Sequence, residues 1–334
     1  MIINLLKNQK IIIMKKVIFF LAVSMLFISC SKDDYPDLDF KQEMRDFVIG
    51  ISECAKSIDA DFIIIPQNGV ELVSNTGDEE GSADPAYASA IDGNGQEDLF
   101  YGYDKDDKAT PSSERSYLMV FLNMSKNAGN TILVTDYCST HSNMDNSYSQ
   151  NNTAGYISFA ADERELNNIP VYPSPIYGEN DEIITALSDI KNFLYLINPE
   201  NYSSKSAFIN AVTSTNYDLL IMDLFFGEGI EFTSAEINQL KNKANGGKRL
   251  VISYMSIGEA EDYRYYWQSG WEPGDPAWVD EENPEWEGNY KVRYWEKEWQ
   301  DIIFGNESSY LKKILNADFD GIYLDIIDAF EYFE

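Results

Sequence analysis

Carboxylates supply almost all of the acid–base chemistry that this sequence can offer. It contains 56 aspartates and glutamates but one histidine, His141, in a polar loop after an apolar run. A single histidine excludes multi-histidine metal sites. Proton transfer must then come from pairs of carboxyl groups, one protonated and one ionised. No calcium-loop spacing is present, so we expect neither a metal nor a cofactor.

Polar side chains follow several of the apolar runs where each run ends. They are Asn68, Asp136, Asp223, Tyr254, Glu259 and Asp325. In a parallel barrel the C-terminal ends of the strands surround the active site, which predicts that these side chains share one site. Each could instead cap the following helix, because Asp and Ser are favourable N-caps. The two interpretations are equally good for one position, but capping is a poor explanation for all of them.

The elements that would position these residues are eight short apolar runs separated by helix-length segments. A helix predicted over 43–58 precedes the first run. The runs lie at 62–65, 98–101, 131–134, 155–159, 193–197, 218–222, 249–254 and 321–324. Short, nearly continuous apolar strands between helices are typical of a buried parallel sheet. Eight of them over one domain predict an α/β fold, a (β/α)8 TIM barrel.

Composition limits the partners of this domain. The chain has 334 residues and a formal net charge of −31, with 44% hydrophobic and 14% aromatic residues. Such an acidic surface repels a phosphate backbone, which excludes nucleic acid as a partner. The apolar content is sufficient for a large core, so the acidity does not indicate disorder. We expect a monomer.

The first 29 residues are predicted to be upstream residues and a lipoprotein signal peptide. Met14 is the expected start, followed by two lysines and an apolar run at 17–28. That run is too short to cross a bilayer, which takes about 20 helical residues.

The sequence Leu26–Cys30 resembles the lipobox of bacterial lipoproteins, with Cys30 as the lipidated residue and Phe27 in place of the usual leucine. The acidic residues after Cys30 resemble an export signal of surface lipoproteins, and residues 30–40 would form an acidic tether. We therefore expect a secreted lipoprotein that is anchored in the outer membrane and exposed on the cell surface. The alternative is an ordinary secretory signal with a free cysteine.

Two longer segments carry a resemblance to a known family. They are Ser253–Arg264, with the sequence SYMSIGEAEDYR, and Asp318–Ala329, with the sequence DFDGIYLDIIDA. Both resemble glycoside hydrolase family 114, the endo-α-1,4-polygalactosaminidase-like TIM barrels, and more closely its bacterial and archaeal extracellular branch. The resemblance extends from about Phe40 to Glu334.

The order of the matching segments differs from that of the family. The segment like 321–328 is the family's fourth strand, and segments like 62–69 and 95–101 follow it there but precede it here. This order indicates a circular permutation. A single barrel over 41–334 would combine the family's second half (41–168), a linker (169–191) and the family's first half (192–334). Loops tolerate such cuts.

The permutation predicts that residues 321–325 pair with residues 62–65. The alternatives are a fragment that straddles two tandem barrels, or an error in the gene model. Eight strands that are each represented once favour permutation.

The resemblance also implies site residues. The family's two catalytic carboxylates match Asp325, in Tyr323-Leu324-Asp325, and Glu97, in the segment 95–100. Residues expected to bind substrate at the same mouth are Glu259, Asp223, Asn68, Asp136, Tyr254, Tyr323 and Arg264. Glycoside hydrolysis requires two such carboxyl groups, and crowding several acids together raises the pKa of one of them. Asp328, one turn after Asp325, is expected to cap the next segment.

All six tryptophans lie between Trp267 and Trp299, in an insert before the last strand. Aromatic faces bind sugars and cations, but large aromatic residues are more often buried. We expect most of them to form a separate aromatic core and one or two to contact substrate.

Two functions are open at this point. The first is a secreted glycoside hydrolase that cleaves an α-linked galactosamine-type polysaccharide by two-carboxylate catalysis. The second is a non-catalytic carbohydrate-binding surface lipoprotein on a degenerate barrel, because a fold does not by itself determine function.

Overall fold

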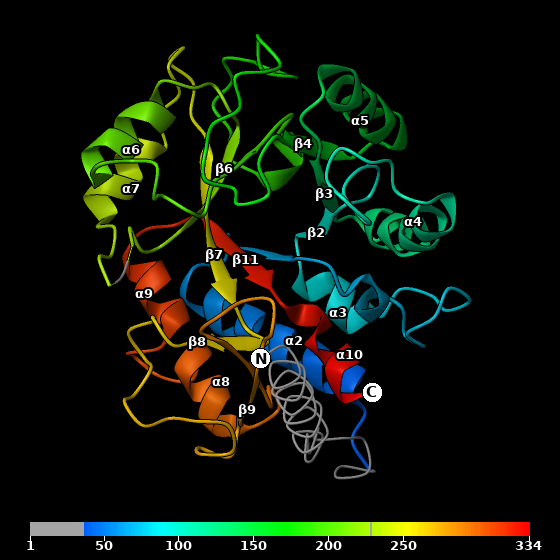
Figure 1. Cartoon of the computed structure of the whole chain (residues 1–334), viewed down its shortest axis with the longest axis vertical. Coiled ribbons are helices and arrows are strands. Elements are labelled where there is room, and N and C mark those ends of the chain that lie inside the picture. Colours follow the sequence, from blue (N-terminus) through cyan, green and yellow to red (C-terminus); the bar gives the residue numbers. More distant parts are fainter. Residues whose placement is uncertain (1–36, 228) are drawn as a thin grey trace, which may run out of the picture. The chain divides into compact units, whose positions relative to one another are not determined.

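In the computed structural model, which describes residues 37–227 and 229–334, parallel strands form the centre of the α/β domain Asp37–Glu334 (Figure 1). The larger sheet has the order β1-β11-β7-β6-β5. Its strands are β1 (Ile63–Pro66), β11 (Gly321–Asp325), β7 (Leu250–Ser256), β6 (Leu219–Asp223) and β5 (Leu194–Tyr195). The predicted signal peptide and Cys30 lie outside the described residues.

The pairing of β1 with β11 joins the two ends of the described sequence. It is parallel, and Ile63 lies opposite Gly321. The predicted pairing of 321–325 with 62–65 is therefore confirmed.

A second parallel sheet continues from β1. It contains β2 (Gly93–Glu97), β3 (Thr131–Tyr137) and β4 (Ile157–Ala161), in that order. A parallel bridge between Gln67 and Gly95 joins it to the first sheet, and the Asn68 N–H donates to the Gly95 carbonyl at 3.0 Å. The parallel strands therefore follow one another from β5 to β4. The ring of Phe159, in β4, lies 5.7 Å from the ring of Phe193, which directly precedes β5, so the two outermost strands are also in contact.

One expected strand was wrong. Residues 98–101 form the turn after β2, and β2 itself has the sequence GNGQE. The strand lacks an apolar pattern because it is packed closely: a Cβ atom on Gly95 would lie 2.0 Å from the Tyr323 hydroxyl. Leu99, Phe100 and Tyr101 instead enter a hydrophobic cluster with the neighbouring helices.

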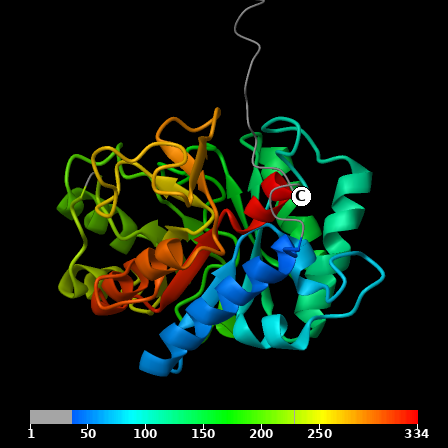
Figure 2. The same ribbon diagram turned by 90° about the horizontal axis from the view of Figure 1, so that it is seen from below.

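Helices surround the strands (Figures 1 and 2). They are α2 (Phe40–Ile58), α3 (Pro85–Ala90), α4 (Ser112–Asn127), α5 (His141–Ala154), α6 (Lys205–Thr213), α7 (Ser234–Leu240), α8 (Lys297–Ile303), α9 (Tyr310–Asn316) and α10 (Phe330–Phe333), with 3-10 turns η2 (Val70–Val73), η3 (Leu187–Asp189) and η4 (Ile327–Ala329). The helix expected over 43–58 is thus confirmed as part of α2. None of the helices in the described ranges is both long and apolar enough to cross a bilayer.

The start of α2 lies beside α10 (Figure 2). Lys41 Nζ forms an ion pair with Glu334 Oε2 at 2.7 Å, and the rings of Phe40 and Phe333 are 5.6 Å apart. Asp39 caps α2 by accepting a hydrogen bond from the Gln42 N–H at 3.0 Å, as Asp does at many helix N-termini.

The insert between β7 and β11 forms a small antiparallel sheet with its own aromatic core. The sheet has the order β8 (Glu259–Glu261), β10 (Asn289–Val292) and β9 (Val279–Glu282). Trp278 and Trp299 are buried and 5.1 Å apart. Trp286 differs, because 53% of its surface is exposed. The expected separate aromatic core is present, and Trp286, Tyr263 and Tyr265 are its exposed rings among the described residues.

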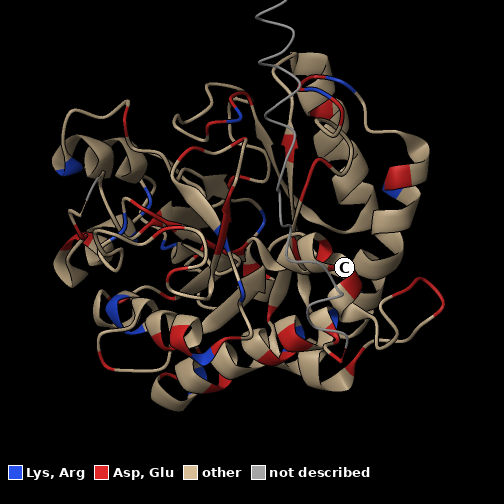
Figure 3. Cartoon of the chain, turned by 60° about the horizontal axis from the view of Figure 1, so that its bottom comes forward, with Lys and Arg blue, Asp and Glu red and all other residues tan. Residues whose placement is uncertain are grey.

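Acidic residues occur on the loops and helices throughout the domain, and basic residues are sparse among them (Figure 3). This distribution is what the net charge of −31 leads us to expect. An excess of one sign gives the surface a field that attracts cationic ligands.

Candidate active site

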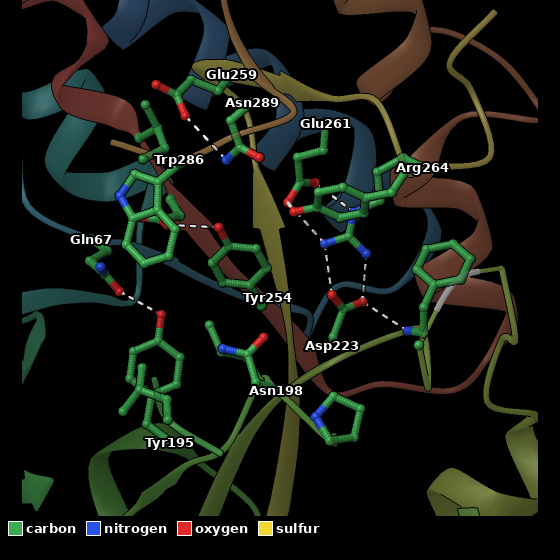
Figure 4. Close-up of a pocket in the computed structure, with 18 of the residues that line it drawn as sticks. Gln67, Tyr195, Asn198, Asp223, Tyr254, Glu259, Glu261, Arg264, Trp286 and Asn289 are labelled. Atoms are coloured by element: carbon green, nitrogen blue, oxygen red, sulfur yellow. Dashed lines mark hydrogen bonds and ion pairs between the residues drawn. The ribbon is translucent and has the colours of Figure 1, made fainter. Parts of the chain in front are cut away.

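A cavity of about 580 Å³ lies at the C-terminal ends of the parallel strands (Figure 4). This is the end at which α/β barrels place their active sites. Most of the predicted site residues line it: Asn68, Glu97, Asp223, Tyr254, Glu259, Arg264 and Asp325. Residues more than 200 positions apart in the sequence thus meet in one cavity.

Glu97 ends β2 and is held by three side-chain donors. Gln67 Nε2 donates to Oε2 at 2.7 Å and Asn68 Nδ2 at 3.1 Å, and the Tyr137 hydroxyl donates to Oε1. Asn68 also accepts a hydrogen bond from the Glu97 N–H at 3.0 Å, so that one amide fixes both the backbone and the side chain. Three donors to two oxygens suit a carboxylate anion, which only accepts.

Two further side chains support these donors. The Tyr195 hydroxyl donates to Gln67 Oε1 at 2.9 Å, which orients the amide so that its nitrogen faces Glu97 (Figure 4). Arg164 lies over the ring of Tyr137 at 3.9 Å and binds Asp98 through both terminal nitrogens. Two of the donors to Glu97, Gln67 and Tyr137, are therefore themselves held in place by other side chains.

Asp325 ends β11 and accepts a hydrogen bond from the Tyr254 hydroxyl at 2.8 Å. Burial and the negative charge of Glu97 raise the pKa of Asp325 to about 8, although the hydrogen bond from Tyr254 opposes that rise. A carboxyl group with this pKa holds its proton near neutral pH, as a general acid must.

The backbone is unusual next to both carboxylates. Asp98 follows Glu97 with φ 58°, Ile326 follows Asp325 with φ 57°, and Asn68 at the end of β1 has φ 61°. A β-branched residue such as Ile rarely adopts this conformation. Conformations of this kind cost about 1–3 kcal/mol each and gather at functional sites.

The opposite side of the cavity contains a buried arginine between two carboxylates (Figure 4). Arg264 binds Asp223 at 2.7 Å and Glu261 at 2.5 Å. Burial raises the pKa of Asp223, and the charge of Arg264 opposes that rise. Both acids are neutralised in part by one cation, so this cluster orients groups rather than supplying a free proton donor.

Glu259 is the first residue of β8 in the small antiparallel sheet, and it is buried, with 1% of its surface exposed. It accepts hydrogen bonds from Asn283 at 2.8 Å and Asn289 at 3.4 Å, and Lys291 Nζ lies 3.5 Å away. Its partners therefore all belong to the insert.

Two predicted substrate-binding residues do not line the cavity. Asp136 is fully buried and accepts hydrogen bonds from two backbone N–H groups of the 98–101 turn, from Ser147 and from Asn151. It holds that turn in place. Tyr323 is also fully buried, and its ring packs 5.3 Å from that of Tyr195 beneath the site.

The expectation that Asp328 caps a helix was wrong. The helical turns η4 and α10 have no side-chain cap. Burial and the charge of Glu331 instead raise the pKa of Asp328 to about 7.

Several residues of the site were not among the predicted site residues. They are Gln67, Tyr137, Arg164, Tyr195, Glu261 and Trp286. Gln67 and Tyr137 follow strand ends directly, so the rule that selected Asn68 could have found them. Arg164 and Tyr195 act through other side chains, and no local pattern marks such roles. Within residues 37–227 and 229–334, no group of three or more His, Cys, Asp or Glu side chains is arranged to hold a metal ion.

Comparison with known proteins matches residues 197–334 to glycoside-hydrolase family GH114. An uncharacterized protein of Methanocaldococcus jannaschii is 41% identical over 156 residues, which are 46% of this chain and 42% of that protein. An uncharacterized protein of Deinococcus radiodurans is 39% identical over 123 residues, 37% of each chain. The chain thus matches about two fifths of the length of these relatives.

Proposed function

Residues 197–334 belong to glycoside-hydrolase family GH114, and from this premise we propose that the protein hydrolyses an α-linked, galactosamine-type polysaccharide. The family supports glycoside hydrolase activity in general. The observation that carries the proposal is the meeting of Glu97 and Asp325 in one cavity, with the pKa of Asp325 raised to about 8.

The two carboxyl groups have different roles, one as the general acid and the other as the nucleophile or general base. Protonated Asp325 gives its proton to the glycosidic oxygen as the bond from that oxygen to the anomeric carbon breaks. Glu97, as a carboxylate, either attacks the anomeric carbon or takes a proton from the water that does so. If Glu97 attacks, water then attacks the anomeric carbon, the bond from that carbon to Glu97 breaks, and the proton of the water passes to Asp325. If Glu97 acts as the base, it releases the proton it took to solvent, and Asp325 regains a proton from solvent.

Charge supports an amine-bearing sugar as the substrate. Besides the protonated Asp325, the cavity lining contains five acidic residues: Glu97, Asp223, Glu259, Glu261 and Glu287. The cations in the lining are Arg164 and Arg264, and each of these already binds two carboxylates. An ammonium group entering this cavity meets an excess of negative charge.

The test is an assay of the purified protein on partly de-acetylated α-1,4-linked polygalactosamine, with new reducing ends as the readout. We expect cleavage by the natural sequence and a loss of more than about 100-fold in Asp325→Asn and in Glu97→Gln, the range for a positioned acid or base. A fully N-acetylated polymer, which lacks the ammonium groups, is the matched control substrate, and we expect it to be cleaved more slowly. Binding without cleavage would favour the carbohydrate-binding alternative. Activity that survives both substitutions would move the assignment to Glu259 and Asp223.

We also propose that the fold is a closed (β/α)8 barrel, permuted relative to the family. In support, the family match begins at residue 197, so it covers only the part assigned to the family's first half. The continuous order of parallel strands from β5 to β4 supports the same proposal.

Cys30 is proposed to anchor the protein to the outer membrane, with residues 30–40 as the tether. Expression in a Gram-negative host with radiolabelled palmitate should label the natural sequence but not Cys30→Ala. Equal labelling of the two proteins would contradict a lipid anchor at this position.

A further inference from the structure

We infer that Trp286 is the platform on which a sugar ring of the substrate stacks, and that Glu259 is a positioning residue for the loop that carries it. The class of sugar rests on the function proposed above. The platform itself rests on the exposure of Trp286, the rigidity of its loop and the position of that loop over the cavity.

Trp286 differs from the other tryptophans of the insert in its surroundings. It lines the cavity that contains Glu97 and Asp325, and 53% of its surface is exposed. Figure 4 shows its ring facing the cavity near Tyr254. Leaving the largest apolar side chain this exposed forgoes part of the stabilisation that burial provides. Ligand pockets are lined mainly by apolar and aromatic side chains, so an exposed indole in the lining of this cavity is placed to contact a ligand.

Hydrogen bonds fix the loop around this ring. The backbone N–H of Trp286 donates to the Asn283 carbonyl at 3.2 Å, and the backbone N–H of Asn289 donates to the Trp286 carbonyl at 3.1 Å. Gly288 has φ 86° and donates to Glu282 Oε1 at 2.9 Å. A Cβ atom on Gly288 would lie 2.7 Å from the carboxylate of Asp262. The ring is therefore presented by a fixed loop, which reduces the entropy lost when a ligand binds.

Glu259 ties the two ends of this loop to the wall of the cavity. Its two carboxylate oxygens accept hydrogen bonds from the side chains of Asn283 and Asn289, which lie three residues before and three residues after Trp286. The amide of Asn283 cannot turn over freely, because its oxygen accepts from the Glu285 N–H at 3.1 Å. This gives the buried Glu259 a mechanical role and explains why its partners come from the insert.

The chemistry of the platform fits an amine-bearing sugar. The apolar face of a pyranose ring packs on an indole, and a cation near the ring gains about 0.5–2 kcal/mol from its quadrupole. Glu287 follows Trp286 and also lines the cavity. A protonated amine on the stacked sugar would have both a π face and a carboxylate within reach.

Binding is tested in the Asp325→Asn background, in which substrate is not consumed. Titration with a de-acetylated α-1,4-galactosamine oligosaccharide should give a Kd at least tenfold higher when Trp286→Ala is added. Tyr103→Ala is the matched control, since Tyr103 is 51% exposed but lies outside the cavity lining. It should change the Kd less than twofold.

Glu259→Gln separates positioning from catalysis. It keeps the size of the side chain but removes one acceptor, so the loop loosens. We expect KM to rise at least fivefold, while kcat stays within twofold and the pH profile is unchanged. A hundredfold lower kcat or a shifted pH profile would overturn the positioning role.

The outcomes for the platform and for the proposed function are distinguishable. Cleavage of the polymer with unchanged binding in Trp286→Ala overturns the platform and leaves the function. Binding that depends on Trp286 without any cleavage supports the platform and removes the hydrolase activity. Failure of all α-linked hexosamine and hexose oligosaccharides to bind overturns both.

Discussion

Asp325 must keep its proton near neutral pH to act as a general acid, and its surroundings favour that state. Burial and the charge of Glu97 raise its pKa to about 8, while the hydrogen bond from Tyr254 opposes the rise. Because the protonated form is the active one, kcat/KM should fall as the pH increases through this pKa.

Tyr254→Phe should move this alkaline limb to higher pH. The substitution removes a hydrogen bond worth about 0.5–1.5 kcal/mol to the carboxylate, which corresponds to roughly 0.5–1 pH unit. The measurement is kcat/KM as a function of pH. Tyr103→Phe is the control and should leave the profile unchanged, whereas a shift of the limb to lower pH would contradict the assignment of Asp325 as the acid.

Asp328 gives a prediction about stability. Its pKa is about 7 in the folded protein, above the usual value for an unfolded chain of about 3.9. The folded state thus binds more protons between these values, and this group makes the protein less stable as pH rises through that window. Asp328→Asn removes this dependence. Its free energy of unfolding, relative to the natural sequence, should be higher at pH 8 than at pH 5 by about 2–3 kcal/mol, because the folded state holds the extra proton over roughly two pH units of this interval and each unit is worth about 1.4 kcal/mol.

Urea denaturation at the two pH values measures the effect of Asp328→Asn. Asp318→Asn is the control, because Asp318 is an exposed aspartate in the same part of the chain. A uniform loss of stability at both pH values would indicate the capping role that the structure does not contain.

At the scale of the elements, the sequence predicts a strand correctly when the strand's own apolar side chains fill the protein core around it. β1, β6, β7 and β11 are of this kind, and their positions follow from apolar runs. β2 is different, because Gly93 and Gly95 leave room for side chains from other strands. Tyr323 occupies the space beside Gly95, and this complementarity between distant segments has no local pattern.

The site shows the same limit. Carboxylates at strand ends were predictable, because neighbouring parallel strands bring their C-terminal ends to the same edge. The donors that hold Glu97 were harder to foresee, since the amide of Gln67 is held by a hydrogen bond from Tyr195, 128 residues away in sequence. Asp136 satisfied the same rule as Asp223 but is turned into the interior, where it binds a loop.

Gly95→Ala tests the packing beneath the site. A Cβ atom there would lie 2.0 Å from the hydroxyl of Tyr323 and 2.5 Å from the attached ring carbon, so the strand or the ring must move. Overpacking of this kind costs about 1–3 kcal/mol. We expect lower stability in urea and lower activity, because Glu97 lies two residues further along the same strand.

Tyr323→Phe is the companion variant for Gly95→Ala. The Tyr323 hydroxyl has no hydrogen-bond partner among the described residues, so its removal should change stability by less than about 1 kcal/mol. In the double variant it should recover part of the loss, because it removes the closest clashing atom. Equal stability of Gly95→Ala and the natural sequence would contradict the close packing of β2 on β11.

At the scale of the whole molecule, the unusual feature is that β1 and β11 are neighbours in space while they lie at opposite ends of the described sequence. The start of α2 and the end of α10 are also in contact, through Lys41 with Glu334 and Phe40 with Phe333. In a permuted barrel, these contacts stand where the family has a continuous chain. Reordering the chain should therefore cost little.

A reordered protein that runs from 172 to 334 and then from 40 to 171 tests this directly. The new junction joins ends that already lie together, and the new opening follows Val171, which is 88% exposed. Backbone that is exposed and weakly hydrogen-bonded tolerates such cuts. We expect a melting temperature within a few degrees of the natural order and a similar kcat/KM. The matched control opens the chain between Ile221 and Met222, inside the buried strand β6, and should not fold. If the first protein fails as the control does, the native contacts at the junction are not equivalent to a chain connection, and the permutation is contradicted.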